Sequence, residues 1–169
     1  MRALAEFIMK GRLQAVAVAG LGVGTLVFAW VGVAAAVLVL LRKGLAEGAY
    51  VVFWALLPAI AVATIGADVG PLTMLLGASA TALVLRNTQQ WANALITAVA
   101  AGLFSALLLT QFANAYLASV LELVQPMWQK MQASAPGKFP EITTGDIAAL
   151  IGVSAVLWST LAVMLGRWW

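Results

Sequence analysis

The stretch that decides the fold is Leu13–Leu41, which reads LQAVAVAGLGVGTLVFAWVGVAAAVLVLL and carries no charged side chain. Lys10 with Arg12 precede it, and Arg42–Lys43 follow it. A single helix over this stretch would be about 43 Å long, well beyond a hydrocarbon core of about 30 Å. Two short helices that turn back near Phe28–Gly32 fit this thickness and return both basic pairs to one side. The stretch therefore predicts a helical hairpin in a membrane.

The composition narrows the class of protein. Hydrophobic residues make up 64% of the chain and charged residues 9%, whereas about a quarter of the residues in soluble proteins are charged. The length of 169 residues predicts a single domain. The chain has no Cys and no His, which excludes disulfides, thiolate chemistry, histidine-ligated haem and ordinary zinc sites. We therefore expect no cofactor and no metal. The cations lie at the ends of apolar segments, which does not indicate nucleic-acid binding.

Apolar segments and helix-capping patterns predict an all-α membrane bundle of six transmembrane helices with two interfacial amphipathic helices. Pro58 is expected to kink the third span, and Pro71 suits the first turn of the fourth. Asn87 with Gln90 resembles a capping box at the start of the fifth span. The predicted segments are an interfacial helix at 1–12, the hairpin at 13–41, spans at 49–67, 70–86 and 88–111, an outer amphipathic segment and loop at 112–142, and the last span at 144–168.

The outer segment and the last span have their own signals. Apolar residues recur at helical spacing through 112–142, so we expect an interfacial helix that is broken near Pro126 and covers the outer mouth of the bundle. Ser134–Pro140 is rich in Pro and Gly and predicts a loop. Thr143 or Thr144 is expected to cap the last span, with Asp146 in its first turn.

The distribution of Lys and Arg predicts the orientation. With six spans, seven cations lie at the inner ends of the helices, and only Lys130 and Lys138 lie outside. If Leu13–Leu41 were one helix, the count would be five against four, which is no bias. We therefore expect six spans with a cytoplasmic N-terminus. The seven inner cations are Arg2, Lys10, Arg12, Arg42, Lys43, Arg86 and Arg167.

Small residues four positions apart allow helices to pack closely in lipid. We expect packing contacts within the molecule at five glycines, with a dimer face through the first two as the alternative. These are Gly20, Gly24, Gly77, Gly102 and Gly152.

Candidate chemistry is sparse. No ionisable residue lies in the middle of a predicted span, although membrane enzymes and proton relays usually carry one there, so we expect a protein that is not an enzyme. Trp54 and Trp158 lie deeper than the other tryptophans and need packing partners. Polar groups collect on the outer side, where they suit either a small-molecule pocket or solvation at the headgroup level. The candidate ligand-binding residues are Asp68, Gln111, Asn114, Tyr116, Trp128 and Asp146.

Four segments resemble the YybS-like family of uncharacterised bacterial inner-membrane proteins: MRALAEFIMKGRLQA at 1–15, VLLRKG at 39–44, WALLP at 54–58 and GRWW at 166–169. The resemblance implies an inner-membrane location and supplies no functional residue. Members of that family continue past the last motif with a further span, so we expect this chain to be a shorter or truncated form. In architecture, the six predicted spans also resemble the S-components of energy-coupling-factor transporters and the rod-shape protein MreD.

Two functions from different classes follow. The first is a non-catalytic membrane component that binds a small, partly apolar molecule, similar to a transporter S-component. The alternative is a scaffold or assembly subunit that binds other membrane proteins and lipid. Expected partners are membrane lipid, other membrane subunits or a second copy of the chain, and a small-molecule ligand. A stand-alone secondary transporter is disfavoured, because the sequence has no convincing inverted repeat and no coupling site at mid-membrane.

Overall fold

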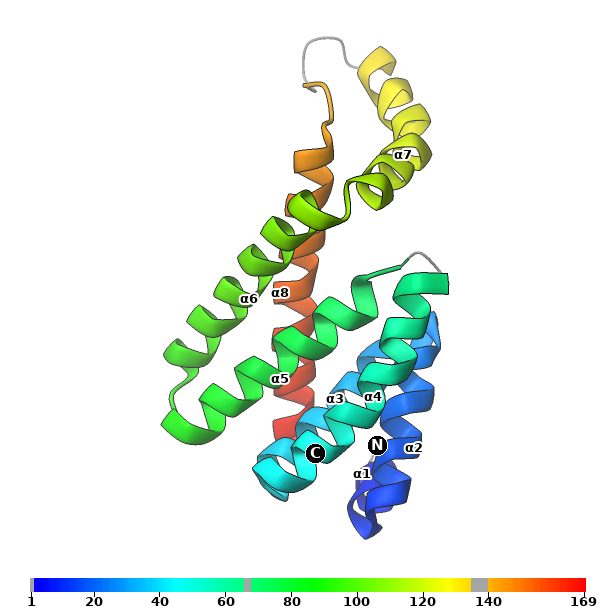
Figure 1. The fold of residues 1–169 in the computed structure, drawn as a ribbon. Helices are drawn as coiled ribbons and strands as arrows, with labels where there is room; N and C mark the ends of the chain where they lie inside the picture. The colour runs from blue at the N-terminus through cyan, green and yellow to red at the C-terminus, as the bar shows by residue number, and fades with distance from the viewer. Residues whose placement is uncertain (1, 66–67, 135–139) are drawn as a thin grey trace.

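The computed structural model describes residues 2–65, 68–134 and 140–169, which form helices joined by short turns (Figure 1). The described part contains no strand, so the all-α prediction is confirmed. The elements are α1 (Arg2–Lys10), α2 (Arg12–Gly24), the 3-10 turn η1 (Leu26–Phe28), α3 (Ala29–Arg42), α4 (Leu45–Ile65), α5 (Gly70–Thr88), α6 (Trp91–Phe112), α7 (Asn114–Ser134) and α8 (Thr144–Trp168).

Three of the described helices are long and apolar enough to cross a membrane: α4, α6 and α8, with 21, 22 and 25 residues. This is compatible with a membrane protein. Helices α2 and α3 are apolar but have only 13 and 14 residues. Helix α5 has 19 residues and is not among the three. Length and composition alone therefore support three spans, and the six expected stay a prediction.

Helices α4, α5, α6 and α8 run in alternating directions, whereas α7 continues away from the termini after α6 (Figure 1). Helix α1 and the C-terminal end of α8 lie at the same end of the bundle, and α7 lies at the opposite end. We call these the termini end and the α7 end. The hairpin break is real but falls slightly earlier than expected, at η1 rather than within Phe28–Gly32.

Helix α3 forms the centre of the bundle. Residues Val33–Leu40 are at most 2% exposed, and α3 contacts α1, α2, α4, α5 and α8. A Cβ atom added to Gly32 would lie 2.5 Å from the Val23 nitrogen of α2, so the two backbones approach too closely for any side chain. Because protein surrounds α3, a helix of about 21 Å need not span lipid by itself.

The other small residues also mediate packing within the molecule. Gly102 of α6 faces Gly152 of α8, and a Cβ added to either would meet the other's carbonyl oxygen within 2.7 Å. A Cβ added to Gly77 of α5 would lie 2.7 Å from the Ser159 hydroxyl oxygen of α8. Positions 20 and 24 face the ring of Pro58. Each predicted packing glycine therefore has a neighbour inside this chain.

Two predicted helix boundaries are wrong, and both errors have local causes. Asn87 does not cap the fifth span, because it lies inside the last turn of α5. Gln89 ends that helix in a left-handed conformation, with φ at 55°. Gln90 occupies the N-cap of α6 without a side-chain capping bond to the backbone. Helix α7 is not broken at Pro126 but continues through it to Ser134, since a proline removes only one backbone hydrogen bond of a helix.

Other local predictions are confirmed. Pro71 lies in the first turn of α5. Thr143 caps α8 in a reciprocal capping box, in which Asp146 accepts from the Thr143 backbone N–H at 2.8 Å. Helix α4 differs from the span predicted at 49–67, because it starts at Leu45; it continues through Pro58, and the kink expected there stays a prediction. The loop expected at 134–140 lies mostly outside the described residues, since 135–139 are not among them.

Candidate ligand-binding site

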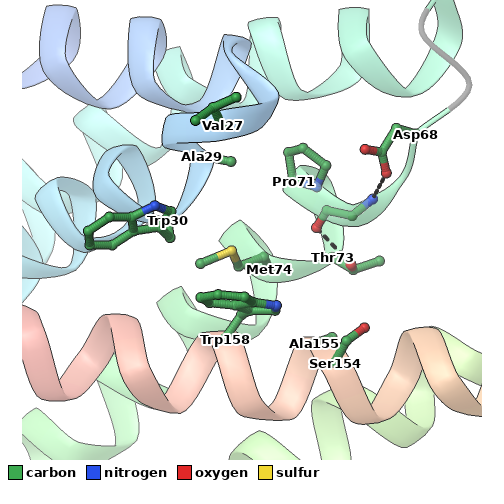
Figure 2. A pocket seen from close by; sticks show the side chains of 11 residues that line it. Val27, Ala29, Trp30, Asp68, Pro71, Thr73, Met74, Ser154, Ala155 and Trp158 are labelled. Carbon is green, nitrogen blue, oxygen red and sulfur yellow. Dashed lines mark hydrogen bonds between the residues drawn. The ribbon is translucent and has the colours of Figure 1, made fainter.

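A cavity of about 450 Å³ lies between the α2–α3 turn, the start of α5 and the middle of α8 (Figure 2). It forms because the short hairpin ends well before the longer α8 does, which leaves the side of α8 uncovered at this level. The lining residues are Val27, Ala29, Trp30, Asp68, Gly70, Pro71, Thr73, Met74, Ser154, Ala155 and Trp158.

The walls of the cavity are mainly apolar and aromatic. Trp30 enters from α3, Met74 from α5 and Trp158 from α8 (Figure 2). Trp30 is 37% exposed and Trp158 is 47% exposed, so part of each indole is available to a ligand. Indole faces attract both apolar groups and cations. Trp158, which was expected to need a packing partner, thus borders open space instead.

The polar side of the cavity offers oxygen acceptors. One carboxylate oxygen of Asp68 accepts from the Gly70 backbone N–H at 2.8 Å, at the start of α5. The Thr73 hydroxyl donates to the Gly70 carbonyl at 3.0 Å, and the Ser154 hydroxyl donates to the Ile151 carbonyl at 2.8 Å. Since both hydroxyl protons are engaged, the two hydroxyl oxygens and the second carboxylate oxygen of Asp68 remain as acceptors.

This arrangement favours a particular chemistry. Among the described lining residues, Asp68 is the one ionisable group. A ligand with an apolar body and a hydrogen-bond donor, above all an ammonium group, matches a carboxylate, two acceptor oxygens and two indole faces. An anionic ligand would meet a like charge at Asp68 and would be disfavoured.

Two of the six candidate ligand-binding residues lie close together. Asp68 lines the cavity, and Tyr116 of α7 lies near Asp68 and the Val69 backbone. Burial raises the pKa of the Tyr116 phenol, and the negative charge of Asp68 raises it further, while a backbone hydrogen bond at Val69 opposes both effects. Tyr116 is therefore a neutral phenol at physiological pH.

The other candidates are placed elsewhere. Trp128 and Asp146 line a second cavity of about 350 Å³ between α7 and α8. The Trp128 indole N–H donates to the Pro140 carbonyl at 2.9 Å, and Asp146 is engaged by Thr143, so both serve local structure. Gln111 and Asn114 are exposed, and their side chains make no hydrogen bond within the described part of the chain.

Helix α7 does not close the main cavity as expected. No described lining residue comes from α7, which packs instead on α6 and α8. Its residues Leu117, Val120 and Leu121 belong to a separate small core with Ile147 of α8. Helix α7, which the amphipathic pattern predicted as a cover for the outer mouth of the bundle, therefore packs on α6 and α8 and does not line the main cavity.

Sequence reasoning missed most of the lining. The sequence predicts that Trp158 needs packing partners, and it marks none of the lining residues except Asp68 as ligand-binding. The one usable hint was the depth of Trp158 in an otherwise aliphatic helix. The cavity joins segments that are about forty and eighty residues apart, so no local pattern could reveal it.

Comparisons of the chain with protein-family models, with curated proteins and with solved structures find no match. The resemblance to YybS-like proteins, to S-components and to MreD therefore stays a prediction that rests on the sequence segments and on the expected architecture. No group of three or more acidic side chains that could hold a metal ion occurs among the residues that the structure describes.

Proposed function

We propose that the chain is a non-catalytic component of a bacterial inner membrane that binds a small, partly apolar, amine-bearing molecule. The observation that carries this proposal is the cavity of about 450 Å³ that Trp30, Trp158 and Asp68 line from different sides (Figure 2). Catalysis is disfavoured because one carboxylate, without a second titratable group among the described lining residues, does not form an acid–base pair.

The membrane placement that goes with this proposal uses six helices. Helices α4, α6 and α8 cross the bilayer at full length, α5 crosses beside them, and α2 with α3 forms a hairpin whose second arm is enclosed by protein. Arg42, Arg86 and Arg167 lie in the last turns of α3, α5 and α8, all at the termini end. The preference of cations for the cytoplasmic side then puts the N-terminus inside and the cavity toward the outside.

The architecture is similar to that of a transporter S-component in one respect, since a ligand cavity would lie near the outer ends of a six-helix bundle. Transport would then need a partner subunit, because the chain offers no coupling site at mid-membrane. The ligand class follows from the cavity chemistry and not from this likeness.

Binding is tested with the full chain in a non-ionic detergent. The probes are phenethylamine and phenylacetate, which share a ring and differ in the sign of charge. We expect phenethylamine to raise the thermal unfolding temperature and phenylacetate to leave it unchanged. Loss of the ion pair in Asp68→Asn should weaken phenethylamine binding about tenfold, because Asn still accepts from the Gly70 N–H but carries no charge.

A matched tryptophan pair supplies the control. Trp158→Ala removes a wall of the cavity and should abolish the stabilisation by phenethylamine. Trp54→Ala removes a similarly exposed tryptophan of α4, whose ring contacts Tyr50 and Phe53. This variant should keep the stabilisation by phenethylamine. Equal stabilisation by the two probes, no stabilisation by either, or equal loss in the two tryptophan variants would each refute the ligand class.

A second candidate, a scaffold that binds other membrane proteins, is favoured by a different feature. An apolar groove of about 320 Å³ runs between α6 and α8 and is lined by Leu103, Val153 and Leu157, among others. A partner helix seated there would be released by Leu103→Trp, which fills the groove without touching the ligand cavity. Retention of all co-purifying subunits by that variant would count against a scaffold at this face.

A further inference from the structure

Three arginines meet at the termini end, opposite the ligand cavity. Arg42 of α3, Arg86 of α5 and Arg167 of α8 line one cavity of about 200 Å³, together with Leu41, Leu85 and Gln89. Helices that are far apart in the sequence thus deliver three guanidinium groups to one small space. A role as topology markers requires only that these cations lie on one side of the membrane, and it does not require a shared cavity.

The neighbours of two arginines hold them in place. The Arg86 guanidinium lies over Gly44, where an added Cβ would come within 3.2 Å of it. Gly44 also has a φ of 108°, which disfavours a side chain. This position therefore favours glycine both for its backbone conformation and for the space that Arg86 occupies. The Arg167 guanidinium lies over the Trp91 ring, 5.4 Å from its centroid. Both contacts leave guanidinium N–H groups available to a ligand.

No carboxylate neutralises this cluster within the described residues. The ion pair found among the described residues joins Arg12 and Glu47, and neither residue lines the arginine cavity. Glu6 lines an adjoining cavity of about 250 Å³ together with Arg42 but makes no ion pair with it. The carboxyl ends of three helices contribute about half a negative charge each, which is less than the three full positive charges. The site is therefore net positive.

A further donor lies beside the cluster. The Trp169 indole nitrogen is buried and has no hydrogen-bond partner, and Trp169 lines the same adjoining cavity as Arg42. Buried N–H groups are nearly always paired in folded proteins. An acceptor that reaches past Arg42 would satisfy this N–H group.

We infer that Arg42, Arg86 and Arg167 form a binding site for a phosphate group. Phosphate is the anion that a set of converging guanidinium groups recognises best, because its oxygens accept several N–H bonds at once. The phosphate could be supplied by the headgroup of an anionic lipid or by free inorganic phosphate. This site lies at the other end of the bundle from the ligand cavity, and the inference does not depend on that cavity.

The test uses the full chain in non-ionic detergent and three probes: phosphatidylglycerol, phosphatidylcholine and inorganic phosphate. We expect one of the two anionic probes to raise the unfolding temperature and phosphatidylcholine to have little effect. Arg86→Gln should weaken binding of that anionic probe about tenfold. Lys10→Gln removes an exposed cation at the same end and should change the affinity for the anionic probe less than twofold. Arg167→Gln carries the same expectation as Arg86→Gln and serves if the latter does not fold.

The outcomes separate the sources of phosphate. Stabilisation by phosphatidylglycerol alone assigns the site to lipid, and equal stabilisation by inorganic phosphate assigns it to a free anion. The inference fails if neither anionic probe stabilises the protein, or if Lys10→Gln weakens binding of the anionic probe as much as both arginine variants do. The arginines would then act only as topology markers. Phenethylamine binding should be unchanged in Arg86→Gln, which keeps this test separate from that of the ligand cavity.

Discussion

Several polar side chains at the α7 end serve local structure before they can serve a ligand. One oxygen of Asp68 is used at the start of α5, Asp146 is used in the capping box of α8, and Trp128 holds the segment that leads into α8. Of these three carboxylate or indole groups, only Asp68 also faces the main cavity. A polar residue near a helix end is therefore weak evidence for a binding site.

Tyr116 gives a test of this environment. Its pKa is raised above the ordinary 10.0, first by burial and then by Asp68. A phenol whose folded-state pKa is raised contributes its full stability below the unfolded-state pKa and loses it as the pH rises toward the folded-state value. We therefore expect stability to fall from about pH 10 upward, and Tyr116→Phe to reduce this alkaline loss in thermal unfolding.

The titration itself can be observed directly. The chain has two tyrosines, so Tyr50→Phe leaves Tyr116 as the one source of tyrosinate absorbance. The midpoint in that variant should lie above 10.0 and should move down in Tyr50→Phe with Asp68→Asn, because the carboxylate charge is removed. A midpoint at or below the ordinary value would contradict the burial of this phenol against α5.

Several pairs of helices in this bundle approach each other closely at glycines. One such approach joins α6 and α8, where Gly102 faces Gly152 and Val156. Close backbone approach of this kind is how apolar helices associate where the hydrophobic effect is weak. Trp158 lines the cavity from α8, which is one member of this closely packed pair.

The glycines differ in how much space surrounds them, which predicts opposite results for the same substitution. Gly102→Ala puts a methyl group 2.6 Å from the Gly152 carbonyl oxygen and should destabilise the protein by about 1–3 kcal/mol. Gly20→Ala meets Pro58 at 3.9 Å, an ordinary contact, and should be neutral or slightly stabilising. Thermal or denaturant unfolding in detergent measures both, and equal effects would contradict the described α6–α8 packing.

The molecule as a unit has two ends with different chemistry. The termini end carries the arginine cavity, and the opposite half carries the aromatic cavity with Asp68. In the six-span placement, the first cavity faces the cytoplasm and the second faces outward.

Cysteine labelling tests this placement, because the chain has no Cys of its own. Ala46→Cys and Ser134→Cys introduce uncharged, exposed sites near the termini end and at the end of α7. A membrane-impermeant maleimide added to intact spheroplasts should label the Ser134 variant and spare the Ala46 variant, and lysis should expose both. Labelling of both sites before lysis, or of the Ala46 variant alone, would refute the six-span orientation.

The local pattern of the chain determined a great deal. The uncharged Leu13–Leu41 stretch between basic pairs predicted a break, and η1 provides one. Thr143 with Asp146 predicted the start of α8, because capping depends on residues within one turn. Apolar length alone identified α4, α6 and α8 as helices able to cross a membrane.

Only the tertiary structure decided which side chains share a space. Trp30, Asp68 and Trp158 come from three separated segments, as do Arg42, Arg86 and Arg167. Periodicity tells which face of a helix is apolar but not which helix lies opposite. The sequence by itself therefore determined the helices and their chemistry, whereas the packing of α3 at the centre decided where the cavities lie.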